Sequence, residues 1–431
     1  MTETILLRRL LVAVLTAAML FVLGGCGRGD VPLSGVSSDP AAESTVSTDA
    51  TDTTASTATT ASADTTSTTT AATTKATTAK PTTTTTQAPT TTTTQAAPTE
   101  YTNPYGVYDV IKTYIGSNAI TERQLLPSVA YTVDDTIVDT MFDSFIFLPS
   151  PVHIYSGIFT NQEAWQDWID EYTFLDGKNM DALEAGTGET KKALGRSDYK
   201  TNAFVTLINP DPENIGNFGE LNGRELDFNN EEDRYEALKW MVDEYIAKFN
   251  SKNYQNVRLA GFYWFDEYLE VDRDKALLNR ITDYIRSKGY ITIYSAFHRS
   301  EGYDRWKECG IDLASMQSNY FPSEPNAPNN GPISRLTDTA AIAQLRDMGI
   351  ELELDNQAKK MGITGFKQTL QVGVRTGYMN GYHVYYFSSG PDAVYTVERH
   401  RDPYFRSVYD ELYKFIKRTL TLDEIQIDLS E

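Results

Sequence analysis

Cysteine and histidine are scarce in this 431-residue chain, which contains two Cys and four His. A disulfide framework is therefore excluded, and the fold must depend on a packed hydrophobic core. None of the four His has the H-x-x-H or H-E-x-x-H spacing of a zinc hydrolase. No D-x-D-x-D-G calcium loop and no G-x-S-x-G nucleophile elbow occur either. We therefore expect neither a metal nor a cofactor.

Basic residues are also in the minority, since 38 Lys and Arg face 59 Asp and Glu, for a net charge of −21. A nucleic-acid-binding surface needs clustered Lys and Arg, so this balance argues against a nucleic-acid partner. Neutral and cationic small ligands remain compatible with it.

Residues 51–100 lack Leu, Ile, Met and every aromatic residue, and 26 of these 50 residues are Thr. Such a segment cannot form a core, so we expect a disordered linker over residues 26–100. Every Trp and Tyr of the chain follows Glu100. The folded domain is therefore predicted at residues 101–431, with no second domain, and we expect a monomer.

Residues 1–25 have the features of a signal peptide: Arg8 and Arg9 precede an apolar stretch that ends in small residues. The sequence Leu23-Gly24-Gly25-Cys26 resembles the bacterial lipobox, which implies a lipid on Cys26. The resemblance predicts an extracytoplasmic protein held at the cell surface through this lipid, with Cys309 as its only free thiol. The linker, with an r.m.s. span on the order of 45 Å, would be a spacer towards an outside polymer. A plain membrane anchor, a secreted protein or a merely solubilising tail are the alternatives.

From Leu125 onward, short apolar runs alternate with helix-period stretches, and there is no evident hairpin signal between them. This pattern predicts a (β/α)8 TIM-type barrel, with a doubly wound open sheet as the second choice. Helices are expected at Glu231–Asn250, capped by Asn229 or Asn230, and at Arg273–Lys288, ended by Gly289. The eight predicted strands are Ser128–Val133, Ser144–Leu148, Ala203–Ile208, Arg258–Trp264, Tyr290–Ala296, Leu313–Gln317, Ile350–Leu354 and Tyr382–Phe387.

The fourth predicted strand ends in an aromatic run followed by two carboxylic acids, Asp266 and Glu267. Beside Tyr263 and Trp264, Glu267 would be partly removed from water, and its pKa would rise as a general acid requires. The alternative is that the two acids only begin the following helix.

The seventh predicted strand carries three acids at alternate positions, Glu351, Glu353 and Asp355. Side chains alternate between the faces of a strand, so these acids would point into the barrel while Leu352 and Leu354 point outward. Burying carboxylates is costly unless they are paired, so the row favours a chemical role. A salt bridge with an inward Arg such as Arg258, or an exposed edge strand, would explain it without function.

Polar and aromatic residues gather at the ends of the other predicted strands. Aromatic faces with interleaved amides and hydroxyls suit a sugar. The candidate substrate-binding residues are Tyr263, Trp264, Asp266, Glu351, His298, Gln317, Asn319, Tyr320 and Tyr386.

Residues 125–418 resemble glycosidase barrels that carry the acid on strand four and the nucleophile on strand seven. The segments Gly261–Glu267, Gln317–Tyr320 and Gly349–Asp355 are similar to those of an uncharacterised glycosidase-like barrel family of bacterial surface proteins. The resemblance implies Glu267 as acid/base and Glu353 as nucleophile, with Glu351 as the spare candidate. Asp266 stands where that class often has Asn.

We therefore expect a surface-anchored glycoside hydrolase acting on an extracellular poly- or oligosaccharide. Two alternatives remain: a glycan-binding protein on an inactive barrel, and the substrate-binding lipoprotein of an importer, which would need two lobes and a hinge.

Overall fold

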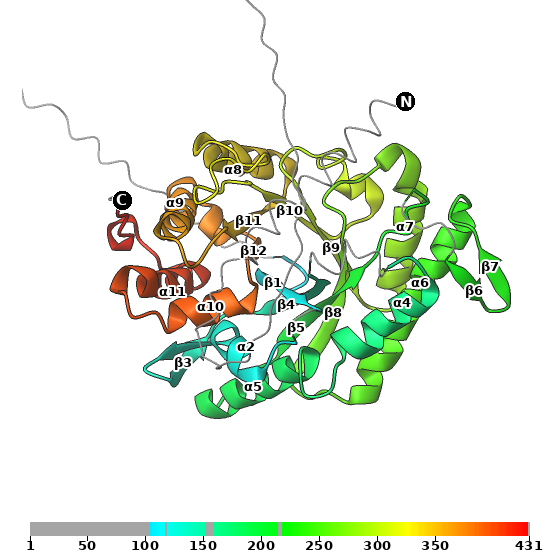
Figure 1. Ribbon diagram of the computed structural model, residues 1–431, viewed down its shortest axis with the longest axis horizontal. Coiled ribbons are helices and arrows are strands. Elements are labelled where there is room, and N and C mark those ends of the chain that lie inside the picture. The colour runs from blue at the N-terminus through cyan, green and yellow to red at the C-terminus, as the bar shows by residue number, and fades with distance from the viewer. Residues whose placement is uncertain (1–102, 117–118, 151–158, 214–217, 430–431) are drawn as a thin grey trace, which may run out of the picture. The chain divides into compact units, whose positions relative to one another are not determined.

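The computed structural model describes residues 103–116, 119–150, 159–213 and 218–429 (Figure 1). The predicted signal peptide, Cys26 and the linker lie outside the described residues. Among the helices that are described, none combines the length and the apolar character needed to span a bilayer.

A closed barrel of eight parallel strands forms the centre of the fold, surrounded by helices (Figure 1). This confirms the (β/α)8 prediction, and the open sheet is wrong because the last strand, β12, pairs with the first, β1. In chain order the strands are β1 (Asp109–Ile115), β4 (Ser144–Pro149), β5 (Thr201–Leu207), β8 (Val257–Trp264), β9 (Ile291–Ala296), β10 (Leu313–Gln317), β11 (Gly349–Leu354) and β12 (His383–Phe387).

The first strand is where the prediction was wrong. Ser128 and Val129 end helix α2 (Glu122–Val129), and Ala130–Val133 is strand β2 of a hairpin outside the barrel. The first barrel strand is β1, which precedes the expected start of the repeat. β1 escaped notice because its inner face carries Lys112 and Tyr114, so it lacks a continuous apolar run.

Two antiparallel hairpins, β2 with β3 (Thr136–Thr140) and β6 (Gly219–Leu221) with β7 (Arg224–Leu226), contradict the expected lack of hairpins. The second turn is Asn222-Gly223, and both residues have positive φ (55° and 79°). Asn-Gly is a strong two-residue hairpin signal, so this turn was readable from the sequence.

Helices cover the outside of the barrel. The Asn230 side chain caps α6 (Glu231–Lys252) by accepting from the Glu232 N–H at 3.0 Å, and Gly289 follows the end of α7 (Val271–Ser287) with φ 87°, as the sequence indicated. The remaining helices are α4 (Gln162–Asp167), η1 (Trp168–Thr173), α5 (Met180–Leu194), η2 (Trp306–Cys309), α8 (Ser334–Arg346), α9 (Lys360–Thr376), η3 (Tyr378–Asn380), α10 (Pro391–Glu398), α11 (Pro403–Ile416) and η4 (Leu422–Glu424).

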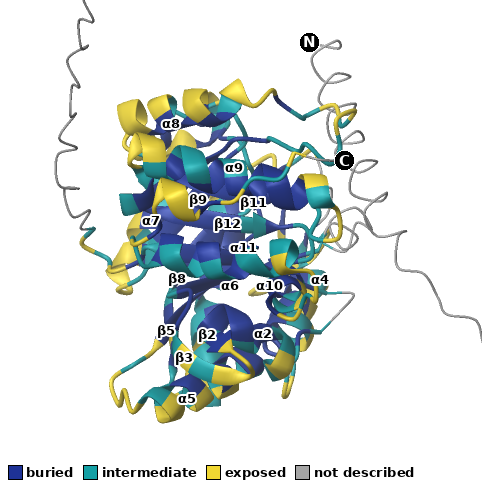
Figure 2. Ribbon diagram, turned by 90° about the vertical axis from the view of Figure 1, so that its left-hand side faces the viewer, coloured by how far each residue is buried: buried dark blue, intermediate teal, exposed yellow. Residues whose placement is uncertain are grey.

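The hydrophobic core has two layers. A large outer layer lies between the strands and the helices and includes Leu352 and Leu354. A smaller layer fills the barrel interior and includes Val110, Ile146 and Tyr263. Figure 2 shows the strands buried beneath partly exposed helices. The barrel interior is thus packed with side chains.

Candidate active site

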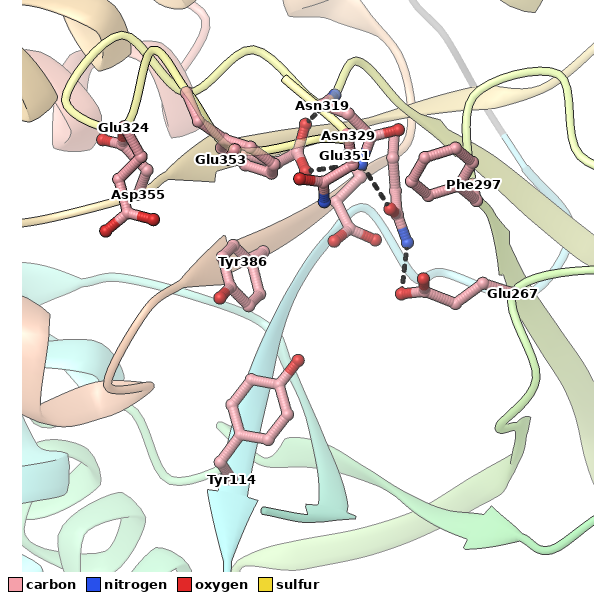
Figure 3. Close-up of a pocket in the computed structure, with 13 residues that line it drawn as sticks. Tyr114, Glu267, Phe297, Asn319, Glu324, Asn329, Glu351, Glu353, Asp355 and Tyr386 are labelled. Atoms are coloured by element: carbon pink, nitrogen blue, oxygen red, sulfur yellow. Dashed lines mark hydrogen bonds between the residues drawn. The ribbon is translucent and has the colours of Figure 1, made fainter. Parts of the chain in front are cut away.

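A pocket lies at the carboxyl ends of the barrel strands, where barrels of this type carry their sites (Figure 3). β1, β10, β11 and β12 contribute residues directly, and the segments after β8, β9, β10 and β11 supply the rest. The lining consists of Tyr114, Glu267, Phe297, Gln317, Asn319, Phe321, Glu324, Ala327, Asn329, Glu351, Glu353, Asp355 and Tyr386.

The acidic row of β11 points into this pocket as the alternation predicted. Glu351 and Glu353 are 1% and 4% exposed, while Leu352 and Leu354 pack in the outer core. β11 lies between β10 and β12, so the edge-strand alternative is wrong. Arg258 is not the partner of the row either, because its guanidinium donates to Asn202 Oδ1 at 2.6 and 3.0 Å.

The cation that balances the row is Lys112 of β1, which sequence reasoning missed. Its Nζ lies 2.8 Å from Glu351 Oε1 and 3.8 Å from Glu267 Oε1, and both Lys112 and Glu351 are buried. Ser295 Oγ also donates to Glu351. Burial of the ammonium by itself lowers the pKa of Lys112, but the negative charge of Glu351 acts in the opposite direction. The net effect raises the pKa of Lys112 well above its usual value. Lys112 therefore stays charged beneath the pocket.

Glu353 is held by donors from the segment that follows β10. Its Oε2 accepts from the Asn319 N–H at 2.5 Å and from Ser318 Oγ at 3.0 Å, and Asn319 Nδ2 lies 3.3 Å from Oε1. Burial, and next the charge of Glu351, raise the pKa of Glu353 to about 8, although these donors and Lys112 favour its ionised form.

Glu267 lies at the mouth of the pocket with a side chain that is 38% exposed. Gln317 Nε2 donates to its Oε1 at 2.5 Å. Desolvation raises the pKa of Glu267, with a further increase from Glu351, while Lys112 and Gln317 act in the opposite direction. The direction of this shift suits a group that must carry a proton near neutral pH.

A chain of side-chain amides connects the two predicted catalytic carboxyls (Figure 3). Gln317 binds Glu267, Asn319 Nδ2 donates to Gln317 Oε1 at 2.8 Å, and Asn319 also reaches Glu353. Asn319 has φ 48°, a left-handed conformation that Asn tolerates better than most residues. Gln317 and Asn319 were predicted to bind substrate; in this structure their amides orient the carboxyls.

Of the predicted site residues, Glu267, Glu351, Glu353, Gln317, Asn319 and Tyr386 meet in the pocket, and the other five do not line it. Tyr263 is buried in the barrel interior, and Trp264, one residue later, faces the outer core. Asp266 accepts from Asn209 Nδ2 at 2.6 Å, and burial raises the pKa of Asp266 to about 7.

The remaining two bond away from the pocket. His298 Nδ1 lies 3.1 Å from Thr339 Oγ1, and burial lowers the pKa of this imidazole. Tyr320 Oη donates to Gln368 Oε1 at 2.8 Å. Both follow strand ends, but each side chain leans towards a surrounding helix.

Sequence reasoning passed over several pocket residues. Tyr114 shares the inner face of β1 with Lys112, and its ring meets Tyr386 edge-on at 6.0 Å. Phe321, Glu324 and Asn329 belong to the loop after β10, and no sequence pattern indicated which of its side chains face inward. Within the described ranges, no group of three or more His, Cys, Asp and Glu is arranged to hold a metal ion.

The fold and the pocket define a (β/α)8 barrel protein with a carboxylate-lined site at the ends of its strands. The chain belongs to the family described as domain of unknown function DUF4855, whose model matches residues 109–414. The match begins at the first residue of β1 and ends inside α11. No protein of curated function matches the sequence.

Several solved structures follow a similar chain course. The endo-β-1,4-mannanase from Thermotoga petrophila is 12% identical, with 75% of this chain and 78% of that chain covered and a TM-score of 0.38. The PgaB (BpsB) glycoside hydrolase domain from Bordetella bronchiseptica is 8% identical, with 71% of this chain and 99% of that chain covered and a TM-score of 0.37. The β-methylaspartase from Clostridium tetanomorphum is 7% identical, with 72% of this chain covered and a TM-score of 0.37. This chain spans only 59% of that enzyme's length.

Proposed function

We propose that the protein is a glycoside hydrolase that cleaves an extracellular poly- or oligosaccharide. The observation that carries the proposal is that Glu267, after the fourth barrel strand, and Glu353, on the seventh, line one pocket and are joined through Gln317 and Asn319. Two carboxyls in one cleft are the usual machinery of glycoside hydrolysis.

In this proposal Glu267 is the acid/base and Glu353 is the nucleophile. Glu267 is exposed at the mouth, where it can donate its proton to the leaving glycosidic oxygen. Glu353 is buried and held by three donors, which fix its position for attack on the anomeric carbon once the carboxyl has lost its proton. Phe297, Phe321 and Tyr386 supply aromatic surface for the CH face of a sugar.

The test is turnover of a panel of glycans by the full-length protein. Glu267→Gln and Glu353→Gln should each lower kcat by roughly 10² to 10⁴ or more, because each removes a proton donor or a nucleophile without changing the side chain's shape. Glu163→Gln, on exposed helix α4, is the matched control and should retain activity. Full activity in both pocket variants would contradict the assignment.

Binding without turnover by the unaltered protein would instead favour a non-catalytic glycan-binding role. The structure contains one feature that suits this alternative: both carboxyls already accept hydrogen bonds from protein amides. Attachment to the cell surface through a lipid on Cys26 is part of the proposal and is supported by the lipobox-like sequence.

A further inference from the structure

The pocket has an unbalanced charge. Five of its lining residues are carboxylic acids, and none is Lys, Arg or His. Lys112 lies beneath the pocket and compensates Glu351, with Glu267 nearby. Within the part of the chain that the structure describes, no ion pair involves the other three: Glu324, Glu353 and Asp355.

The two remaining cations near the pocket are directed at backbone oxygens. Arg335 Nη1 donates to the carbonyls of Asn329 at 3.0 Å and Asn319 at 3.3 Å. Lys359 Nζ donates to the Ser323 carbonyl at 3.3 Å. These bonds shape the pocket wall. Within the described residues neither cation forms an ion pair with a pocket carboxyl, although the charge of Lys359 acts on Glu324 and that of Arg335 acts with Glu353.

Glu324 and Asp355 lie next to one another at the end of the pocket remote from Glu267, with Glu353 between the two ends (Figure 3). Asp355 is fixed there, since its Oδ2 accepts from the Ser323 N–H at 2.9 Å and from Ser323 Oγ at 2.7 Å. Burial and then the attraction of Lys359 and the repulsion of Asp355 act on Glu324, and its pKa is raised. A cation bound between the two acids would relieve that repulsion.

The hydrogen-bonding groups of the pocket also favour a ligand that donates hydrogen bonds. The side-chain amides of Gln317 and Asn319 already donate hydrogen bonds to Glu267 and Glu353, respectively. Asn329 Oδ1, by contrast, is a buried acceptor that has no hydrogen-bond partner among the described residues. Asn329 Oδ1 therefore needs a donor from the ligand. An ammonium group offers three donors and no acceptor, whereas a carboxylate or an acetamide oxygen adds further acceptors.

We propose that the pocket selects a cationic glycan, in which a sugar with a free ammonium group sits against Glu324 and Asp355 while its anomeric bond lies at Glu353. This inference rests on the proposed function for the position of the anomeric bond, and on the pocket alone for the charge of the ligand. Uronic acids and phosphorylated or sulfated sugars are excluded by the same carboxyls.

Calorimetric binding tests the inference without turnover. The full-length Glu267→Gln variant is titrated with β-1,4-linked tetramers of glucosamine, N-acetylglucosamine and glucose, which differ only in the 2-substituent. Methyl glycosides of the same three sugars remove any dependence on linkage. We expect the glucosamine compounds to bind at least about tenfold more tightly than the glucose compounds, as one charge-assisted hydrogen bond allows.

Two further variants separate a specific site from general attraction to an acidic protein. In the Glu267→Gln background, Glu324→Gln should bring the preference close to unity by weakening the binding of the glucosamine compounds, and Glu163→Gln should preserve the preference. Equal binding of glucosamine and glucose, no binding of the glucosamine compounds, or an unchanged preference in Glu324→Gln would overturn the inference.

The outcome is distinguishable from that of the proposed function. Selective binding without turnover by the unaltered protein supports the cationic ligand and contradicts the hydrolase. Turnover of neutral glycans without any preference for glucosamine does the reverse.

Discussion

At the scale of single residues, the decisive feature is a buried charge pair below the pocket. Lys112 and Glu351 are each 1% exposed and lie 2.8 Å apart. Such a pair adds little net stability, but breaking it by removing one partner is expensive because the other charge stays buried. The charges of Lys112 and Glu351 both act on the pKa of Glu267 and on the pKa of Glu353.

Lys112→Met should therefore lower the free energy of unfolding by about 3 to 5 kcal/mol, because Glu351 is left buried without its cation. Urea unfolding measures the loss. The double variant Lys112→Met, Glu351→Gln removes both charges and should recover most of it. Equal stability of the single and double variants would show that the pair is not coupled.

Glu353 should make the stability of the protein depend on pH. Its pKa is raised from 4.5 to about 8, so the folded state favours the protonated form. The cost of ionising it is absent below about pH 4.5, grows as the pH rises, and is complete above about pH 8.

Glu353→Gln removes that cost while keeping an oxygen that accepts from the Asn319 N–H. The melting temperature of the variant should match the native value near pH 5 and exceed it increasingly up to pH 9. The corresponding gain in unfolding free energy is on the order of a few kcal/mol. Thermal unfolding across this range, with Glu163→Gln as the control, is the measurement. A difference that does not vary with pH would argue against a raised pKa.

At the scale of elements, a polar cluster ties the end of α11 to the start of β1. Arg418 Nη1 lies 2.7 Å from Asp109 Oδ2, and Asp109 Oδ1 contacts His383 Nδ1 at 3.0 Å and accepts from Tyr385 Oη at 2.7 Å. Burial opposes ionisation of Asp109, but Arg418 and His383 outweigh it and hold its pKa below the ordinary value.

Arg418→Met should cost about 1 to 3 kcal/mol of unfolding free energy at neutral pH, because a buried charged acceptor loses a donor. Because the pKa of Asp109 is lowered in the folded state, its ionised form stabilises the fold at a pH above the pKa of the unfolded chain. The loss of unfolding free energy in Arg418→Met should therefore shrink as the pH falls through the pKa of Asp109. Denaturant unfolding at several pH values measures it. Arg305→Met, which removes exposed ion pairs with Asp272 and Glu308, serves as the control and should cost below about 1 kcal/mol.

At the scale of the whole molecule, the sequence divides into a predicted lipid attachment, a Thr-rich linker and a barrel. The barrel places its pocket residues on strand ends and following loops, so the scaffold and the site are separate parts of the fold. The proposed surface location would bring that pocket to an extracellular polymer.

Cys26→Ala should abolish incorporation of labelled palmitate and release the protein from the membrane fraction of the bacterial cell, because the acceptor thiol is lost. Cys309→Ala is the matched control and should leave the label in place, since Cys309 is buried in the fold. Unchanged labelling of Cys26→Ala would contradict the lipobox assignment.

The local pattern of the sequence determined much of this protein. A strand repeats every two residues, so the alternation in β11 was enough to place Glu351 and Glu353 on one face. Seven of the eight barrel strands were found because both faces of such strands are buried and read as apolar runs. β1 was missed because its inward Lys112 and Tyr114 break that run.

The tertiary structure decided the rest, because charge compensation and pocket lining depend on residues far apart in the chain. Lys112 and Glu351 are separated by 239 positions and meet only because the barrel closes between β1 and β12. Barrel closure likewise leaves Tyr263 inside the barrel and turns Trp264 towards the helices, and the loop after β10 brings Glu324 to Asp355. Residue types at strand ends can be read from a sequence, but the partner that satisfies each buried charge is a property of the folded chain.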